Sequence, residues 1–394
     1  MTRIGIDDIA FYTSNFYLDL HILAEKRNTD HDKYASGIGI EKIGIPAPDE
    51  DIITMGANAA IQILEQCDRQ KIDTLLFATE SSVDQSKSAA VFVHRLLDLP
   101  SECRTVELKQ ACYSSTAAVQ IACALVARNP EKSVLVISSD IARYDLESAG
   151  EATQGCGAVA MLIKADPRIL SIEPGSGCYS ADTWDFWRPN YCSNPKVDGK
   201  FSIINYIRTA KECWKNLAKN TGVDFNSIYR FCYHLPFSTM GLKAHIKLGK
   251  EMSAGKTQQE LEAQVLPSTV CCRQIGNCYS ASAYIALCSL LDNEQDLAGK
   301  NVAIFGYGSG CAGEFYYGVV SDSYQKMLRT DHNKKLLSAR EAIDFSTYLE
   351  FYQASDTKKY QDGNYTTPAV TPGMFRFSGI RNHARMYDRC ADDL

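Results

Sequence analysis

The sequence predicts a layered α/β fold built from two similar halves, with helices between and around mixed sheets. Predicted strands alternate with predicted helices along most of the chain. A cysteine-centred segment also occurs twice, because Cys112-Tyr-Ser-Ser-Thr-Ala and Cys278-Tyr-Ser-Ala-Ser-Ala share the Cys, the Tyr, a Ser and the last Ala. Each copy leads into an apolar helical run and then a Lys-X-Val strand, so the same supersecondary unit is expected twice.

The first half is predicted to alternate strands with helices. The segment 133–138 (Ser-Val-Leu-Val-Ile-Ser) is strongly apolar, as is typical of a strand in the middle of a layered sheet. We expect strands at 72–79, 103–108, 133–138 and 157–163, a helix at about 86–97, and a helix that opens at Cys112 and runs to about 128.

The second half is predicted to repeat this order. We expect a strand at 228–233 that ends at His234, a helix from about 238, a segment 270–275 that leads to Asn277, a helix at 279–291, and a strand at 301–305 that ends in Gly306-Tyr-Gly-Ser-Gly310. The halves are placed at 1–166 and 167–394. The region after about 321 is polar and shows no recognisable catalytic constellation, so it is interpreted as a peripheral cap.

Composition narrows the functional class. The 394 residues are 45% hydrophobic and carry a net charge of −6, so a large core is possible and a basic stripe for nucleic acid is not expected. The chain starts with polar and acidic residues, and its apolar runs at 117–126 and 283–291 are too short to cross a bilayer. No signal peptide and no membrane span are expected.

The cysteines favour a reducing compartment. There are 15 of them with no Cys-X-X-Cys, which argues for free thiols in the cytoplasm and gives no support for a zinc or other metal site. Most are expected to be small buried hydrophobic residues, so a reactive cysteine must be identified from its local setting.

The duplication predicts which loops meet. If the halves are related by a pseudo-two-fold axis, Glu80 and His234 occupy matching positions at the ends of matching strands. Loops at the carboxyl ends of such strands gather on one side of the sheet. Glu80, Cys112, His234, Asn277 and the 306–310 loop are therefore expected to converge.

Nine short motifs give the chain a family resemblance that spans nearly its whole length. They are Gly-Ile-Gly at 37–39, Thr-Glu-Ser-Ser at 79–82 before Ser-Lys at 86–87, Lys-Gln-Ala-Cys-Tyr at 109–113, Asp-Ile-Ala-Arg-Tyr at 140–144, Thr-Gln-Gly at 153–155, Asp-Phe-Trp-Arg-Pro at 185–189, His-Leu-Pro-Phe at 234–237, Gly-Asn at 276–277 and Gly-Ser-Gly at 308–310. In these motifs the sequence resembles bacterial-type 3-hydroxy-3-methylglutaryl-CoA (HMG-CoA) synthases of the thiolase superfamily. The resemblance implies a thiolase-like fold, a homodimer, and an acyltransferase of the mevalonate pathway of isoprenoid biosynthesis.

That resemblance implies that acetyl-CoA, acetoacetyl-CoA and water give HMG-CoA and CoA through an acetyl-cysteine. Cys112 is the expected nucleophile, and a place at a helix N-terminus predicts a lowered pKa for its thiol. Glu80 is expected to remove a proton from the acetyl methyl group, and His234 to protonate or polarise the alkoxide that forms on addition to the ketone. The CoA thioesters are substrates, so no cofactor is expected.

Other residues are expected to orient and bind the substrates. The N–H groups of Cys112 and Ser309 are predicted to hold the oxyanion. By resemblance, Asn277 orients the second substrate or His234, and Tyr144 lines the acetyl pocket.

Coenzyme A carries phosphates that need positive charge. Lys243 and Lys247 share one helical face and are candidates to bind them, with Arg188 as another candidate. Gly308 and Thr153 complete the expected substrate-binding set.

Several alternatives remain open. β-Ketoacyl carrier-protein synthase III could use Cys112, His234 and Asn277, but it typically has Gln-Ala-Asn where this chain has Leu-Pro-Phe, and it lacks a base at Glu80. A polyketide β-branching synthase would perform the same chemistry with an acyl carrier protein as partner. The alternative that is not an enzyme is a non-catalytic thiolase-like protein that acts as a scaffold.

A glycine motif late in the chain needs a separate interpretation. Gly308-Ser-Gly-Cys-Ala-Gly313 matches the dinucleotide fingerprint, but the residues that follow are strand-like, so no helix N-terminus is available for a pyrophosphate. We therefore expect no nicotinamide or flavin, and interpret the loop as tight backbone packing beside Cys112.

Overall fold

The computed structural model describes residues 2–252, 255–354 and 356–390. In the first half the predicted strands and helices are present at the expected places. They are β4 (Ile72–Ala78), α3 (Ala89–Leu96), β5 (Arg104–Leu108), α4 (Ser114–Arg128), β6 (Ser133–Ala142) and β7 (Gly155–Ala165). Strand β6 is buried along almost its whole length and has β4 on one side and β7 on the other, which confirms its predicted central place.

The second half repeats the strand pairing of the first. Its elements are β12 (Arg230–Tyr233), α6 (Ser238–Glu251), α8 (Val270–Ile275), α9 (Ser282–Asn293), β13 (Asn301–Gly308) and β14 (Ala312–Val320). Strand β4 is parallel to β6 and β6 antiparallel to β7, just as β12 is parallel to β13 and β13 antiparallel to β14. The repeat is incomplete, because segment 270–275 is a helix where the first half has the strand β5.

A single mixed sheet runs through both halves. Its order is β12-β13-β14-β8-β1-β7-β6-β4-β5, with β9 (Gly177–Ser180) also paired to β14. The short strand β8 (Leu170–Ile172) joins the halves, because it pairs with β1 (Ile4–Tyr12) on one side and with β14 on the other.

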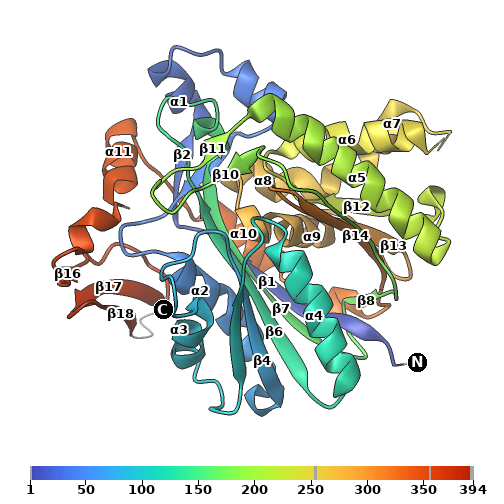
Figure 1. The fold of residues 1–394 in the computed structure, drawn as a ribbon, viewed down its shortest axis with the longest axis horizontal. Helices are drawn as coiled ribbons and strands as arrows, with labels where there is room; N and C mark the ends of the chain where they lie inside the picture. The colour runs from blue at the N-terminus through green and yellow to red at the C-terminus, as the bar shows by residue number, and fades with distance from the viewer. Residues whose placement is uncertain (1, 253–254, 355, 391–394) are drawn as a thin grey trace.

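Helix α9 lies near the centre of the molecule, and α4 lies in front of β4 and β6 (Figure 1). Helix α4 contacts β4 and β6 of the first half and β13 of the second, while α9 contacts β12 and β13 as well as β1 and β7. Helices α2 (Ile52–Leu64) and α3 cover the other face of the first half, and α5 (Gly199–Thr221) and α6 cover the second. A side chain at Gly306 would place its Cβ 2.1 Å from Thr116 Oγ1, so the close approach of β13 to α4 requires glycine there.

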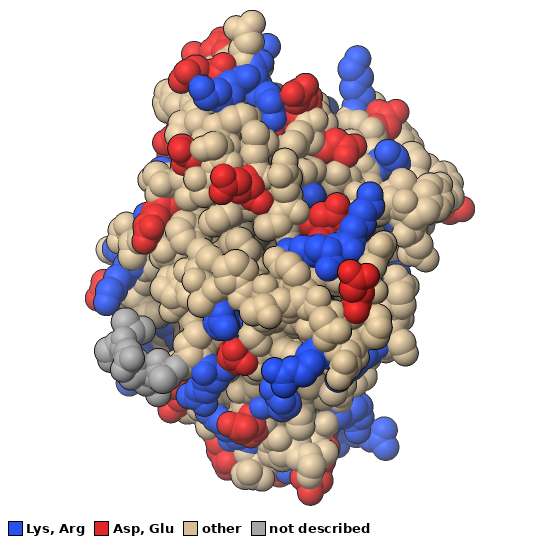
Figure 2. Space-filling view, turned by 90° about the vertical axis from the view of Figure 1, so that its left-hand side faces the viewer, with Lys and Arg blue, Asp and Glu red and all other residues tan. Residues whose placement is uncertain are grey.

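The segment after residue 321 returns to the first half. It contains α10 (Thr330–Ser338), β15 (Glu341–Ala342), α11 (Phe345–Ala354), β16 (Tyr365–Thr366), β17 (Phe375–Arg381) and β18 (Ala384–Arg389). Strand β15 pairs with β2 (Phe16–Asp19), which also pairs with β3 (Lys42–Ile45), and β17 packs on α2. Figure 2 views this side of the molecule and shows Lys and Arg interspersed with Asp and Glu.

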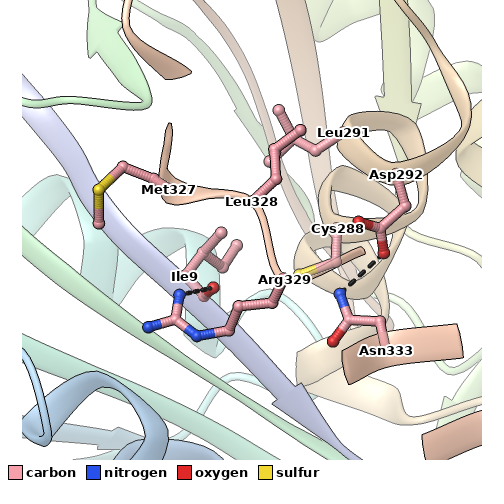
Figure 3. A pocket seen from close by; sticks show the side chains of 8 residues that line it. All are labelled: Ile9, Cys288, Leu291, Asp292, Met327, Leu328, Arg329 and Asn333. Carbon is pink, nitrogen blue, oxygen red and sulfur yellow. Dashed lines mark hydrogen bonds between the residues drawn. The ribbon is translucent and has the colours of Figure 1, made fainter. Parts of the chain in front are cut away.

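A buried ion pair anchors this returning segment. Arg329 is paired with Asp8. Figure 3 shows that Arg329 also donates to the carbonyl of Ile9, at 3.0 Å, and that Asn333 donates to Asp292, at 2.7 Å. The cavity lined by Ile9, Asp292, Arg329, Asn333 and their neighbours has a volume of about 10 Å³. That is room for about one water molecule, so this cavity is not a substrate site.

The remaining α-helices and β-strands of the described residues are short. They are α1 (Leu20–Lys26), α7 (Gln258–Ala263) and the hairpin of β10 (Phe186–Trp187) and β11 (Lys196–Val197). Within the described ranges no helix is long and apolar enough to span a membrane.

Candidate active site

Cys112 lies in a tight turn between β5 and α4. The helix begins at Ser114, two residues later than predicted, and the residue before the cysteine, Ala111, has a positive φ of 43°. A positive φ is unfavourable for alanine, so the surrounding contacts must hold this turn in place.

The thiol of Cys112 donates a hydrogen bond to Glu80. The distance from Sγ to Oε2 is 3.2 Å. Glu80 follows β4 and Cys112 follows β5, and these strands are parallel neighbours, so their carboxyl ends bring the two side chains together. The predicted convergence of this pair is confirmed.

The carboxyl group of Glu80 is well placed to be a base. Its pKa is raised to about 7, first because the group is buried and second because the negative charge of Asp140 is close. The hydrogen bond from Cys112 and the charge of Arg188 act in the opposite direction. A carboxyl group with a pKa near neutrality accepts protons more readily than an ordinary glutamate and is still ionised in about half of the molecules at pH 7.

The predicted lowering of the Cys112 pKa is wrong. Burial, followed by the negative charge of Glu80, raises the pKa of the thiol well above its usual value. The helix N-terminus is two residues away, so its influence does not outweigh these effects. Cys112 is therefore protonated at rest, and a base must take its proton when it attacks.

Asp140 organises the turn that carries Glu80. This buried side chain at the end of β6 accepts hydrogen bonds from the backbone N–H groups of Glu80 and Ser81, both at 2.9 Å, and from the hydroxyl of Thr79 at 2.7 Å. It also accepts from Ser280 of the second half, through both the backbone and the hydroxyl. The motif at 140–144 signalled this residue, but its role depends on contacts that the sequence does not show.

His234 is buried directly after β12. Its backbone N–H donates to the carbonyl of Phe305 at 2.8 Å, and its own carbonyl accepts from Tyr206 at 2.6 Å. Burial lowers the pKa of its imidazole to about 3, so the ring is neutral at pH 7. Its Nδ1 atom is buried and has no hydrogen-bond partner within the described part of the chain. The ring centre of Tyr206 lies 6.4 Å from that of the imidazole.

Tyr144, Thr153 and Asn277 meet on one wall of the site. Burial, followed by the proximity of Cys112 and Glu80, raises the pKa of the Tyr144 hydroxyl, and the nearby side chains of Thr153 and Asn277 act in the opposite direction. The backbone N–H of Asn277 donates to the carbonyl of Thr153 at 3.1 Å. The predicted place of Tyr144 beside the nucleophile agrees with this geometry. No described contact joins Asn277 to His234, so of its two expected roles, orienting a substrate fits better.

Aromatic rings enclose the thiol. Phe186 and Tyr279 form an apolar cluster with Ala142, and Cys112 and Tyr144 pack against it. The ring centre of Phe186 lies 6.0 Å from the ring centre of Tyr144 and 6.0 Å from that of Tyr279. This wall restricts water at the thiol and accounts for the desolvation that raises the pKa values of Cys112 and Glu80.

The glycine-rich loop lies against the nucleophile turn. Gln110 donates to the carbonyl of Ser309 at 3.3 Å. A Cβ at Gly308 would lie 2.4 Å from the carbonyl oxygen of Gln110 and 2.7 Å from the nitrogen of Tyr113. Asp185 fixes the far end of the loop by accepting from the N–H of Gly310 at 3.0 Å. The interpretation of this loop as close backbone packing is confirmed, and β14 follows it as predicted.

The cationic candidates take two different positions. Lys243 and Lys247 are both exposed on α6, and Lys243 donates to the carbonyl of Gly37 at 3.4 Å. Arg188 instead donates to the carbonyl of Glu80, which places its charge beside the base. A surface hollow of about 350 Å³ adjoins it, lined by Trp184, Trp187, Arg188, Pro189 and Tyr191.

The C-terminal segment supports the site, which the sequence did not indicate. Tyr352 on α11 donates to the carbonyl of Tyr144 at 2.8 Å. The side chain of Gln154 accepts from the N–H of Tyr144 at 3.0 Å and donates to Tyr348 at 2.9 Å. Tyr348 and Tyr352 are spaced as on one face of a helix, a pattern that in the sequence indicates only ordinary core packing.

All fifteen cysteines are free thiols. Among the described residues, no group of three or more His, Cys, Asp or Glu side chains could hold a metal ion. Cys278 is buried next to Gly157, whose Cβ would lie 3.0 Å from its sulfur.

The thiol of Cys112 is hydrogen-bonded to a carboxyl group of raised pKa, and the two related halves of the chain contact each other through α4 and α9. This combination of fold and site defines a thiolase-like condensing enzyme. Family models described as hydroxymethylglutaryl-coenzyme A synthase N terminal and C terminal match residues 2–168, and 171–249 with 240–387. The chain belongs to the hydroxymethylglutaryl-CoA synthase family.

Individual relatives agree. The chain is 40% identical to the hydroxymethylglutaryl-CoA synthase of Enterococcus faecalis, over 90% of this chain and 93% of that protein. It is 30% identical to the polyketide biosynthesis 3-hydroxy-3-methylglutaryl-ACP synthase PksG of Bacillus subtilis, over 92% and 91%. A solved HMG-CoA synthase complexed with CoA superimposes with a TM-score of 0.92, 37% identity and coverage of 98% and 100%. The predicted family, fold class and synthase activity are confirmed.

Proposed function

We propose that this synthase condenses acetyl-CoA with acetoacetyl-CoA, with Cys112 as nucleophile and Glu80 as base. The observation that carries the proposal is the 3.2 Å hydrogen bond from Cys112 to a carboxyl group with a pKa of about 7. Neither residue alone is specific, but the pair supplies an acyl acceptor and a proton acceptor at one place.

In the first step the sulfur of Cys112 attacks the thioester carbonyl of acetyl-CoA. The new S–C bond forms as the bond to the CoA sulfur breaks. Glu80 accepts the thiol proton and passes it to the departing CoA thiolate, which leaves acetyl-Cys112 and an ionised Glu80. This order explains why a thiol with a raised pKa can still react.

In the second step Glu80 removes a proton from the acetyl methyl group. The enolate attacks the ketone carbon of acetoacetyl-CoA, and the ketone oxygen becomes an alkoxide. His234 is neutral at pH 7, so it stabilises that oxygen by donating a hydrogen bond from its ring N–H. The alkoxide gains one proton and Glu80 returns the one it took from the methyl group, so that the condensation is balanced. Water then cleaves the thioester to Cys112 and releases HMG-CoA. The N–H groups of Cys112 and Ser309 are proposed to stabilise the oxyanions along this path.

We propose that Lys243 and Lys247 bind the phosphates of CoA. Both ammonium groups are exposed on one face of α6, the helix that follows His234. Arg188 stays a third candidate, and its guanidinium group lies beside the base because it donates a hydrogen bond to the backbone carbonyl of Glu80. Substrates that bring their own CoA need no further cofactor.

The second candidate acceptor is a β-ketoacyl group on an acyl carrier protein. The 30% identity to PksG supports a carrier-protein acceptor, while the 40% identity to the Enterococcus faecalis synthase favours the CoA thioester. Turnover with acetoacetyl-CoA and with acetoacetyl carrier protein at equal concentration separates the two. A higher kcat/KM with acetoacetyl carrier protein than with acetoacetyl-CoA would show that the acceptor is the carrier-bound group, and would contradict the proposed substrate.

We propose a cytoplasmic homodimer that forms through the edge strand β5. This strand has a neighbour on one side only, and it carries Val106, which is 37% exposed. Val91 of α3 and Ile121 of α4 are also exposed, and both helices contact β5. Such an edge can pair with its copy about a two-fold axis. Light scattering of the purified protein should give twice the chain mass.

The function is tested by incubating the protein with acetyl-CoA and analysing the peptide that contains Cys112 by mass spectrometry. We expect an acetyl group on Cys112, and no adduct on the matched variant Cys112→Ala. Formation of HMG-CoA should then require acetoacetyl-CoA. Acetylation at another residue, or turnover by Cys112→Ala, would exclude the proposed nucleophile.

A further inference from the structure

Glu314 is a buried acidic residue behind the nucleophile turn. It lies on β14, is 3% exposed and forms none of the ion pairs found among the described residues. Its Oε2 atom accepts a hydrogen bond from the hydroxyl of Tyr113 at 2.7 Å. A buried carboxylate without a cation is unfavourable for stability, so its presence suggests a local task.

The groups around Glu314 are neutral. Cys178 on β9 is its direct partner in the strand pairing, and the hydroxyl groups of Tyr284 and Tyr316 lie near enough for Glu314 to act on their pKa values. None of these groups supplies a positive charge. The bond to Tyr113 is thus the contact through which Glu314 reaches the active site.

Tyr113 immediately follows the nucleophile and precedes the first residue of α4. The turn that contains it is strained, because Ala111 has a φ of 43°. Three contacts from the β13–β14 hairpin act on this turn: the bond from Gln110 to Ser309, the close approach of Gly308, and the bond from Tyr113 to Glu314. The second half of the chain thereby holds the nucleophile of the first.

We propose that Glu314 is a positioning residue for Cys112. By accepting from Tyr113 it ties the turn to β14 of the second half, and so keeps the sulfur and the backbone N–H of Cys112 aligned with the thioester. This inference rests on the proposed role of Cys112 as nucleophile. It requires a hydrogen-bond acceptor at position 314 rather than a charge.

The test is a double-mutant cycle read as the first-order rate of Cys112 acetylation by acetyl-CoA. The variants are Tyr113→Phe, which removes one oxygen, Glu314→Leu, the two combined, and Glu314→Gln as the matched control that keeps an acceptor. Each single loss should slow acetylation about tenfold, as for the loss of one intramolecular hydrogen bond. The combined variant should be no slower than the single ones, the acetyl-CoA concentration for half-maximal rate should not change, and Glu314→Gln should remain close to the parent.

Three results would overturn the inference: multiplicative effects in the combined variant, a Glu314→Gln variant as slow as Glu314→Leu, or no effect of Tyr113→Phe. Urea unfolding of each variant separates a global loss of stability from a displaced turn. If Glu314→Leu does not fold, the comparison of Tyr113→Phe with Glu314→Gln still decides, because both changes are nearly isosteric. A parent protein that is not acetylated at all would instead refute the proposed function.

Discussion

The thiol of Cys112 donates to the carboxyl group of Glu80 over 3.2 Å, and this pair connects two neighbouring parallel strands. The contact couples the nucleophile of the first step to the base of the second. The two side chains act on each other's pKa values. Glu80 raises the pKa of the Cys112 thiol, and the hydrogen bond from that thiol lowers the pKa of the Glu80 carboxyl group. The predictions below follow from this coupling.

The pH dependence of kcat/KM should show an acid limb near pH 7. Glu80 must be ionised to accept a proton, and its pKa is raised to about 7. Activity should therefore fall about tenfold for each pH unit below that value. Arg188→Gln removes a positive charge that lowers this pKa, so its acid limb should move to higher pH, whereas Arg188→Lys should keep it near the parental position. A limb that does not move in Arg188→Gln would show that this arginine does not act on Glu80.

Replacement of His234 should separate the two chemical steps. His234→Ala removes the neutral donor to the alkoxide, so condensation should fall by about 10²–10⁴-fold. Acetylation of Cys112 should continue, because the proton acceptor for that step is Glu80. Rapid-quench measurement of acetyl-enzyme and of HMG-CoA checks both rates, and equal loss of both would contradict the division of roles.

Gly308→Ala should disrupt the nucleophile turn. The new Cβ would lie within 2.7 Å of backbone atoms of Gln110 and Tyr113, which cannot move aside as a flexible side chain would. We expect a loss of stability of about 1–3 kcal/mol, as for overpacking of a close contact, and acetylation slowed at least tenfold. Gly199→Ala is the matched control, because nothing lies within 4 Å of its Cβ, and it should behave like the parent in urea unfolding and in activity.

Cys278 should prove structural despite its repeated sequence setting. It is 1% exposed, and burial raises the pKa of its thiol well above the usual value. Cys278→Ala should keep acetylation at Cys112 and lower stability by about 1 kcal/mol through the small cavity left. Peptide mapping after acetyl-CoA treatment checks this, and an acetyl group on Cys278 in the parent would contradict it.

The sequence predicted the elements best where the apolar pattern was continuous. Strands β4, β6 and β13 and helix α4 lie within a few residues of their expected places, and the repeated cysteine segment correctly indicated matching halves. The sheet connection through β8 could not be predicted, because it depends on strand pairing between residues far apart in the chain.

The sequence indicated most of the residues that form the site, but not the direction in which the pKa of Cys112 is shifted. The pKa of Cys112 was expected to fall because a helix N-terminus was expected at the cysteine itself. The turn at Ala111 shifts the helix by two residues, and burial beside Glu80 reverses the sign. The supporting contacts of Asp140 and Glu314 join the two halves, so they depend on three-dimensional packing that no local pattern reports.

The central claim is that Glu80 is the base for carbon–carbon bond formation. Its most direct test is the variant Glu80→Gln, which keeps the shape of the side chain and removes the proton acceptor. Because Glu80 also accepts the thiol proton in the first step, acetylation of Cys112 should become slow in this variant, with water as the remaining proton acceptor. After prolonged incubation with acetyl-CoA and acetoacetyl-CoA, mass spectrometry should still find acetyl groups on Cys112 but no HMG-CoA above the level of Cys112→Ala. Formation of HMG-CoA by Glu80→Gln at a rate close to that of the parent would contradict the claim.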